Sequence, residues 1–307
     1  MFKKVLIPTD FSAYARRIAE CVSDIPGVKE VVLLHVVSRP TLTRFWDPVA
    51  WVKDAEKKLA EEKKFIEVPG IDVKTRAISA LGRDISGAIQ RVASEENVSL
   101  VIMGARGLSL IQSALLGSAS RNVLRFGDRH LLIMRFKAVG GTEGLQFFKE
   151  PRTIRSEGAR LEKFCADLFS KVLVPTDFSQ PEEAAISFIK SIPGLGEILL
   201  LHVVSKGETQ MEIDASVKSA TEMLKTISQE LSMGGLKVTT RVVIGNPVEQ
   251  IRSLAEEADV SLIAMSSVGK DTMLTGRIGS RTYDVANTAD RPVLVVRMKP
   301  IFAVPEA

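Results

Sequence analysis

The sequence has few of the residues that metal sites and disulfide frameworks require. It contains 2 cysteines and 3 histidines in 307 residues. The cysteines, Cys21 and Cys165, form neither a CxxC pair nor a metal-ligand spacing. We therefore expect no metal centre, reduced thiols and a cytoplasmic location.

Long apolar runs are also missing. No run approaches the roughly 18 apolar residues that a membrane span requires. The start, MFKKVLIPTDFS, has too short an apolar stretch for a signal peptide. We expect a protein that is not attached to a membrane.

Charge of one sign is not concentrated anywhere in the chain. The formal net charge is +4 and the sequence pI is about 9.0, but acidic and basic residues are interspersed. This pattern does not predict a nucleic-acid partner, which would favour a clustered basic face. A hydrophobic content of 45% in 307 residues is enough for the cores of two ordinary domains.

The chain contains two copies of one sequence. KKVLIPTDFS at 3–12 returns as SKVLVPTDFS at 170–179, and EVVLLHVVS at 30–38 returns as EILLLHVVS at 197–205. A period this long indicates a duplicated domain and not a solenoid. We predict domains at 1–137 and 170–300, joined by a linker at 138–169 that contains a helix.

Strands and helices alternate in each copy. Strands are expected near 5–7, 31–37, 72–78, 99–103 and 130–136, and in the second copy near 171–175, 197–204, 236–243, 260–265 and 292–298. This order predicts an α/β fold with a doubly wound, five-stranded parallel sheet in each domain. The fifth strands are strongly apolar and would be exposed at a sheet edge. We therefore predict that they pair with each other in an intramolecular pseudo-dimer, which leaves open a further homodimer.

A glycine-marked loop follows the fourth strand of the first copy. The apolar run Leu100–Met103 ends at Gly104, followed by Gly107 and then by Gly117 and Ser118. Glycines let backbone N–H groups approach a ligand, and a helix N-terminus favours anions. The loop is a candidate phosphate site, although three turn glycines and a serine helix cap would give the same spacing.

The first strand ends at Pro8, Thr9 and Asp10, and open α/β sheets bind ligands beyond such strand ends. If this strand neighbours the fourth, Asp10 faces the glycine loop, where its carboxylate can bind ribose hydroxyls or a magnesium ion. Val36 and Met103 end two strands and can enclose a base. Each residue alone is better explained as a cap or as core; together they suit a nucleotide.

These residues resemble the universal stress protein family. The first copy has that family's nucleotide motif, Gly-x2-Gly-x9-Gly-[Ser/Thr], together with its strand-end PTDFS at 8–12 and its LHV at 34–36. The resemblance implies a Rossmann-like sheet of strand order 3-2-1-4-5 and an adenine-nucleotide site for AMP, ADP or ATP. It implies Asp10 at the ribose, Val36 and Met103 near the adenine, and Gly107, Gly117, Ser118 and Ala119 at the phosphates.

The predicted cofactor-binding residues occur in both copies. In the first they are Pro8, Thr9, Asp10, Val36, Met103, Gly104, Arg106, Gly107, Gly117, Ser118 and Ala119. In the second they are Pro175, Thr176, Asp177, Val203, Met265, Ser266, Gly269, Gly279, Ser280 and Arg281. Ser266 replaces the first glycine of the motif and adds a Cβ, which predicts weaker nucleotide binding by the second copy.

The sequence thus predicts a nucleotide-responsive regulatory module of the stress response, with an unidentified protein partner. Two alternatives stay open: an enzyme of the same superclass with slow ATP hydrolysis or nucleotidyl transfer, and an interaction protein that binds no nucleotide. We assign no catalytic residue, because no Gly-x-Ser-x-Gly elbow and no Gly-x4-Gly-Lys-[Ser/Thr] loop is present.

Overall fold

The computed structural model describes residues 2–38, 47–66, 68–80, 84–105, 115–135, 167–205, 207, 209–269 and 278–298. The chain divides into two units, Met1–Ala166 and Asp167–Ala307, and each is described by itself. Most of the predicted linker and its helix, at 138–169, lies outside the described residues.

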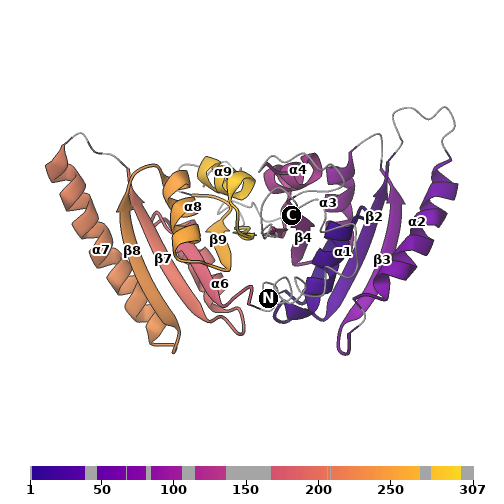
Figure 1. The fold of residues 1–307 in the computed structure, drawn as a ribbon, viewed down its shortest axis with the longest axis horizontal. Coiled ribbons are helices and arrows are strands. Elements are labelled where there is room, and N and C mark those ends of the chain that lie inside the picture. Colours follow the sequence, from indigo (N-terminus) through magenta and orange to yellow (C-terminus); the bar gives the residue numbers. More distant parts are fainter. Residues whose placement is uncertain are drawn as a thin grey trace, which may run out of the picture. The chain divides into compact units, whose positions relative to one another are not determined.

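The first unit is built on a five-stranded parallel sheet of order β3-β2-β1-β4-β5 (Figure 1). Its strands are β1 (Lys4–Pro8), β2 (Glu30–Val37), β3 (Asp72–Ser79), β4 (Leu100–Gly104) and β5 (His130–Met134). Its helices are α1 (Ala13–Glu20), α2 (Pro48–Lys63), α3 (Ile85–Glu95) and α4 (Ser118–Phe126), with a 3₁₀ turn at Cys21–Asp24. The predicted α/β fold and strand order are confirmed.

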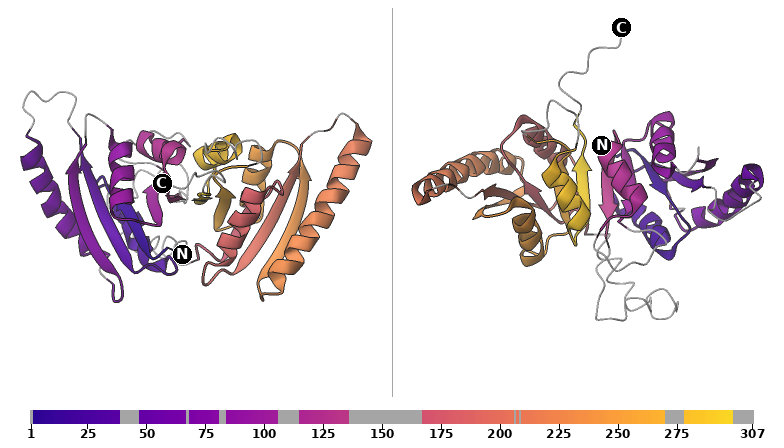
Figure 2. Two further views of the ribbon diagram at one scale, coloured as in Figure 1. Left: turned by 180° about the vertical axis from the view of Figure 1, so that it is seen from behind. Right: turned by 90° about the horizontal axis from the view of Figure 1, so that it is seen from above.

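The second unit repeats this arrangement with the order β8-β7-β6-β9-β10. Its strands are β6 (Lys171–Pro175), β7 (Glu197–Val204), β8 (Lys237–Ile244), β9 (Leu262–Ser266) and β10 (Val293–Val296). Its helices are α6 (Gln180–Lys190), α7 (Gln210–Ser232), α8 (Pro247–Glu257) and α9 (Ser280–Thr288). In both views of Figure 2, as in Figure 1, α2 lies along β3 and α7 lies along β8.

The apolar pattern of the central strands explains their place in the sheet. Val5, Leu6 and Ile7 of β1 have no exposed surface, as expected for a strand covered on both faces. Polar side chains mark where helices begin: the Ser12 hydroxyl accepts a hydrogen bond from the Ala15 N–H at 3.1 Å. All five strands run parallel, but strands are added on one side of β1 up to β3 and on its other side from β4 onward, so the switch point lies at the carboxyl ends of β1 and β4.

Two further predictions meet different outcomes. Pairing of the fifth strands in a pseudo-dimer stays a prediction. The expectation of reduced thiols is wrong for Cys21, which is disulfide-bonded; the other cysteine, Cys165, lies outside the described residues. Spacing in the sequence does not reveal pairs of distant cysteines, so cysteine usage no longer supports a cytoplasmic location.

Among the described residues, no helix combines the length and the apolar character needed to cross a membrane.

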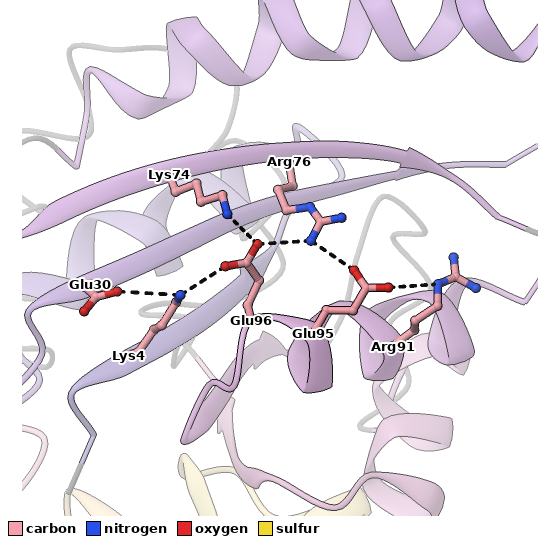
Figure 3. Close-up of polar contacts among 7 residues, drawn as sticks. All are labelled: Lys4, Glu30, Lys74, Arg76, Arg91, Glu95 and Glu96. Carbon is pink, nitrogen blue, oxygen red and sulfur yellow. Dashed lines mark hydrogen bonds and ion pairs between the residues drawn. The ribbon is translucent and has the colours of Figure 1, made fainter.

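A charged network lies at the amino end of the first sheet, away from the switch point (Figure 3). The Glu96 carboxylate, with a side chain only 8% exposed, accepts hydrogen bonds from Lys4 at 3.0 Å, Lys74 at 2.6 Å and Arg76 at 3.0 Å. Together these cations hold the pKa of Glu96 down at about 2; the Lys74 hydrogen bond contributes most. The network ties β1, β3 and the end of α3 together.

Candidate functional site

The turn after β1 presents Asp10 at the carboxyl edge of the first sheet. The Thr9 N–H donates to the Leu34 carbonyl at 2.8 Å, which holds the end of β1 beside β2. Phe11 follows with a φ of 62°, an uncommon value for a residue other than glycine. Two side chains stabilise this turn, since Thr9 Oγ1 accepts from the Phe11 N–H and Asp10 Oδ1 from the Ser12 N–H, each at 3.0 Å.

His35 supports the turn from β2. Its Nδ1 lies 2.8 Å from the Thr9 carbonyl oxygen, and its ring stacks on Phe11 at 4.2 Å between centroids. Burial lowers the pKa of His35, which favours a neutral ring whose Nδ1–H donates to Thr9. The second unit repeats this arrangement. His202 Nδ1 lies 2.8 Å from the Thr176 carbonyl oxygen, and the rings of His202 and Phe178 stack with their centroids 4.5 Å apart. Both histidines are therefore structural, as their place in a strand predicts.

Replacing His35 with alanine is expected to lower the free energy of unfolding of the first unit by about 2 kcal/mol, since a buried hydrogen bond and a ring stack are lost. In the unaltered chain a lowered histidine pKa means that the unfolded state takes up the proton first, so stability falls as the pH drops below about 6.5. The variant should lose that pH dependence. Urea unfolding followed by tryptophan fluorescence at pH 7 and pH 5.5 measures both effects.

Fluorescence reports on the first unit, because both tryptophans, Trp46 and Trp51, belong to it. His202→Ala is the matched control and should leave this transition unchanged. An unaltered midpoint in His35→Ala would contradict the supporting role of the ring.

The N-terminus of α4 lies at the same carboxyl edge of the sheet, next to the end of β4. The Gly117 N–H donates to the Ala105 carbonyl at 2.8 Å, and the Ser120 hydroxyl donates to the Gly104 carbonyl at 2.7 Å. Gly117 has a φ of −60° and a ψ of 157°, which any residue adopts, and an added Cβ would lie 3.7 Å from the Ala105 carbonyl oxygen. The backbone conformation does not require glycine at position 117. The absence of a side chain there instead leaves space in front of the N-terminus of α4.

The remaining predicted residues of the first unit lie on the elements that meet at this edge. Pro8 ends β1, Val36 lies near the end of β2, and Met103 and Gly104 end β4. Ser118 and Ala119 open α4. Arg106 and Gly107 lie outside the described residues.

A pocket occupies the equivalent edge of the second unit. Nearly all residues predicted for this copy line it: Pro175, Thr176, Asp177, Val203, Met265, Gly269, Gly279, Ser280 and Arg281. Glu182, Leu201, His202, Pro247, Ile251 and Thr282 complete the lining. The strand ends, Gly269, Gly279 and the start of α9 therefore line one space.

Ser266 is the predicted residue that does not line this pocket. Its side chain is buried, and its hydroxyl accepts a hydrogen bond from the Val268 N–H at 3.3 Å. Its carbonyl accepts from the Thr282 hydroxyl at 2.8 Å, as Gly104 does from Ser120. The side chain of Ser266 is therefore accommodated inside the unit and does not line the pocket. Weaker nucleotide binding by the second copy stays a prediction.

Two acidic residues near these edges were not predicted. Glu182, on α6, is 8% exposed, and burial, reinforced by the Asp177 carboxylate, raises its pKa to about 8 while Arg281 opposes the shift. On α2, Glu62 is buried close to Thr9 and Asp10, and burial raises its pKa while Thr9 opposes the shift. Comparing the copies would have flagged Glu182, because Ala15 stands at the equivalent position.

The fit of a magnesium ion near Asp10 depends on other ligands. Among the described residues, no three side chains of His, Cys, Asp or Glu cluster closely enough to hold a metal ion. One oxygen of Asp10 already accepts from the Ser12 N–H. Because magnesium prefers six oxygen ligands, phosphate oxygens and waters would have to supply most of them.

Comparisons with known proteins show the family of the chain. The profile described as "Universal stress protein family" matches residues 1–135 and 168–297. A universal stress protein of Methanocaldococcus jannaschii is 31% identical in an alignment of length 157 that covers 43% of this chain and 97% of that protein. One of Methanothermobacter thermautotrophicus is 31% identical in an alignment of length 144 that covers 44% of this chain and 97% of that protein.

A solved structure extends the similarity to nearly the full length. The crystal structure of a universal stress protein from Archaeoglobus fulgidus aligns with a TM-score of 0.66 and 25% identity, covering 96% of each chain. Family matches therefore cover both units and leave only the connecting segment and the last residues unmatched. The chain belongs to the universal stress protein family.

Proposed function

We propose that this protein binds adenine nucleotides, AMP, ADP or ATP, at the carboxyl edge of its sheets and acts as a nucleotide-responsive stress module. The pocket of the second unit carries the proposal, because residues chosen from the sequence as nucleotide ligands line one space. The first unit keeps the complete glycine motif and serves as the principal site.

Different residues of the site suit different parts of the nucleotide. The apolar ends of β2 and β4, Val36 and Met103, suit a flat base, and the Asp10 carboxylate suits ribose hydroxyls. The N-terminus of α4 at Ser118 suits phosphates, since unpaired N–H groups and the helix dipole favour negative charge there. Magnesium, when bound, would join the nucleotide through its phosphates near Asp10.

The test is the quantity of adenine nucleotide released per chain when the freshly purified protein is denatured, measured by mass spectrometry. About one nucleotide per chain is expected from the principal site, rising toward two where the second pocket is also filled. Titration of the stripped chain with AMP, ADP and ATP then ranks the ligands. No released nucleotide together with no binding would favour an interaction protein, and conversion of ATP to ADP during the titration would favour the slow enzyme.

A further inference from the structure

Glu182 is an unusual residue to find in the pocket of the second unit. Glu182 lines the pocket, and the residue as a whole is only 8% exposed. Among the described residues no hydrogen bond to its carboxyl is formed, and its interactions are electrostatic ones with Asp177 and Arg281. The carboxyl is therefore available to bond with a ligand that fills the pocket.

The charges around Glu182 define what that ligand can be. Arg281, at the start of α9, also lines the pocket, with Nη1 4.0 Å from Asp177 Oδ2. Asp177 Oδ2 is close to Gly269, since a Cβ built on Gly269 would lie 3.1 Å from it. Because the charge of Glu182 interacts with both Asp177 and Arg281, Glu182 belongs to the same part of the pocket, where Gly269, the start of α9 and the arginine would receive phosphate.

Three negative groups cannot share this end without a proton. An ionised Glu182 beside Asp177 and a phosphate dianion would face a single guanidinium and the partial charge of a helix end. A neutral carboxylic acid avoids this repulsion and gains an O–H that can donate to a phosphate oxygen. Besides Asp177 and Arg281, His202 is the one titratable group among the described residues lining the pocket.

We propose that the second unit binds a phosphate-bearing adenine nucleotide together with one proton, which Glu182 holds and donates as a hydrogen bond to the phosphate. Glu182 is thereby a specificity-determining residue that distinguishes the two units, since Ala15 stands at its counterpart in the first. The inference rests on the proposed function and adds a proton requirement to one of its two sites.

The protonation of Glu182 gives the inference a measurable consequence. Its pKa of about 8 means that the carboxyl is largely protonated at pH 7 and largely ionised at pH 9. The second ionisation of a phosphate monoester lies near pH 6, so AMP keeps a constant charge across this interval. Any loss of affinity between pH 7 and pH 9 then reports on the protein.

The experiment measures AMP binding by calorimetry from pH 7 to pH 9.5 in a Gly117→Val chain, where only the second pocket is left intact. Affinity is expected to fall by about tenfold from pH 7 to pH 9. Buffers of different ionisation enthalpy should show uptake of about one proton at the upper end. Glu182→Gln is then added, because glutamine keeps the shape of the side chain and an N–H that can donate to phosphate. The AMP affinity should stay within about threefold at pH 7, and both the fall in affinity with pH and the proton uptake should disappear.

The first unit serves as the internal control. In a Gly279→Val chain only the first site remains, where Ala15 cannot titrate but Glu62, which interacts with Asp10, has a raised pKa. Glu62→Gln is therefore added to this chain, and its AMP affinity should then not change over the same interval. Adenosine, which lacks phosphate, should bind the second pocket without pH dependence. Thermal unfolding of each variant checks that the units are folded.

Several results would overturn the inference while leaving the proposed function intact. One is an AMP affinity that still falls with pH after Glu182→Gln, and another is an AMP affinity of the Gly117→Val chain that does not change with pH. A third is an adenosine affinity that falls as the AMP affinity does. The fourth is no AMP binding by Gly117→Val at any pH when the unaltered chain binds AMP. Absence of AMP binding by the unaltered chain at every pH would instead overturn the proposed function itself.

Discussion

Replacing Gly117 with valine is expected to lower the adenine-nucleotide affinity of the first unit by ~100-fold or more, or about 2.7 kcal/mol in binding free energy. The branched side chain would fill the space before the N-terminus of α4, where phosphates are proposed to lie. The fold should survive, because the φ of −60° and ψ of 157° suit a β-branched residue and the nearest neighbour of a Cβ is 3.7 Å away. Calorimetric titration with ATP, beside a urea unfolding curve, measures both parts.

Gly279→Val is the matched control, since Gly279 occupies the same position before α9. It should remove binding by the second unit and leave the first unaffected. Undiminished binding in the Gly117→Val and Gly279→Val double variant would show that the glycine loops do not form the nucleotide site.

Replacing Glu96 with glutamine is expected to lower the free energy of unfolding of the first unit by about 2 kcal/mol at pH 7 and low salt. A pKa held at about 2 corresponds to a larger free energy, but solvent screens a network at the rim of a sheet. Because the pKa of Glu96 is lowered in the folded chain, its contribution to the free energy of unfolding is fully present above its pKa in the unfolded chain, near 4.5. It is lost as the pH falls from there toward 2, so the difference between the two chains should shrink at low pH.

Urea unfolding of both chains at pH 7 and pH 3, followed by tryptophan fluorescence, tests this expectation. Glu95→Gln removes a neighbouring carboxylate with a more exposed side chain, 46% against 8%, and should change stability much less. Equal destabilisation by the two variants, or a Glu96 effect that persists undiminished at pH 3, would contradict a role for the ionised carboxylate.

The comparison of the copies explains why Glu96 matters in one unit. In the second unit Ala258 stands at the equivalent position, and Lys171 donates instead to its backbone carbonyl at 2.8 Å. Glu197 there accepts from Lys237 at 2.9 Å and from Thr239 at 3.0 Å. The same edge is thus held by different side chains, which shows that the network serves the fold and not the ligand.

The sequence by itself determined the fold and the general position of the site. Apolar strands such as Val5–Ile7 are buried on both faces because a parallel sheet covered by helices requires it. Alternation of strands with helices predicts a parallel sheet with right-handed crossovers, and the resemblance to the family predicts the strand order. The duplicated PTDFS and glycine segments predict a candidate site in each unit, because ligands of such sheets bind at the switch point.

Tertiary structure decided what each pocket contains. Whether the Ser266 side chain faces the ligand or the core depends on how β9, α9 and the Val268 N–H are arranged, which spacing does not specify. Glu182 reads in the sequence as an ordinary acidic residue in the first turn of a helix; only burial beside Asp177 and Arg281 changes its chemistry. Burial and charge depend on neighbours distant in sequence, so they emerge only once the chain is folded.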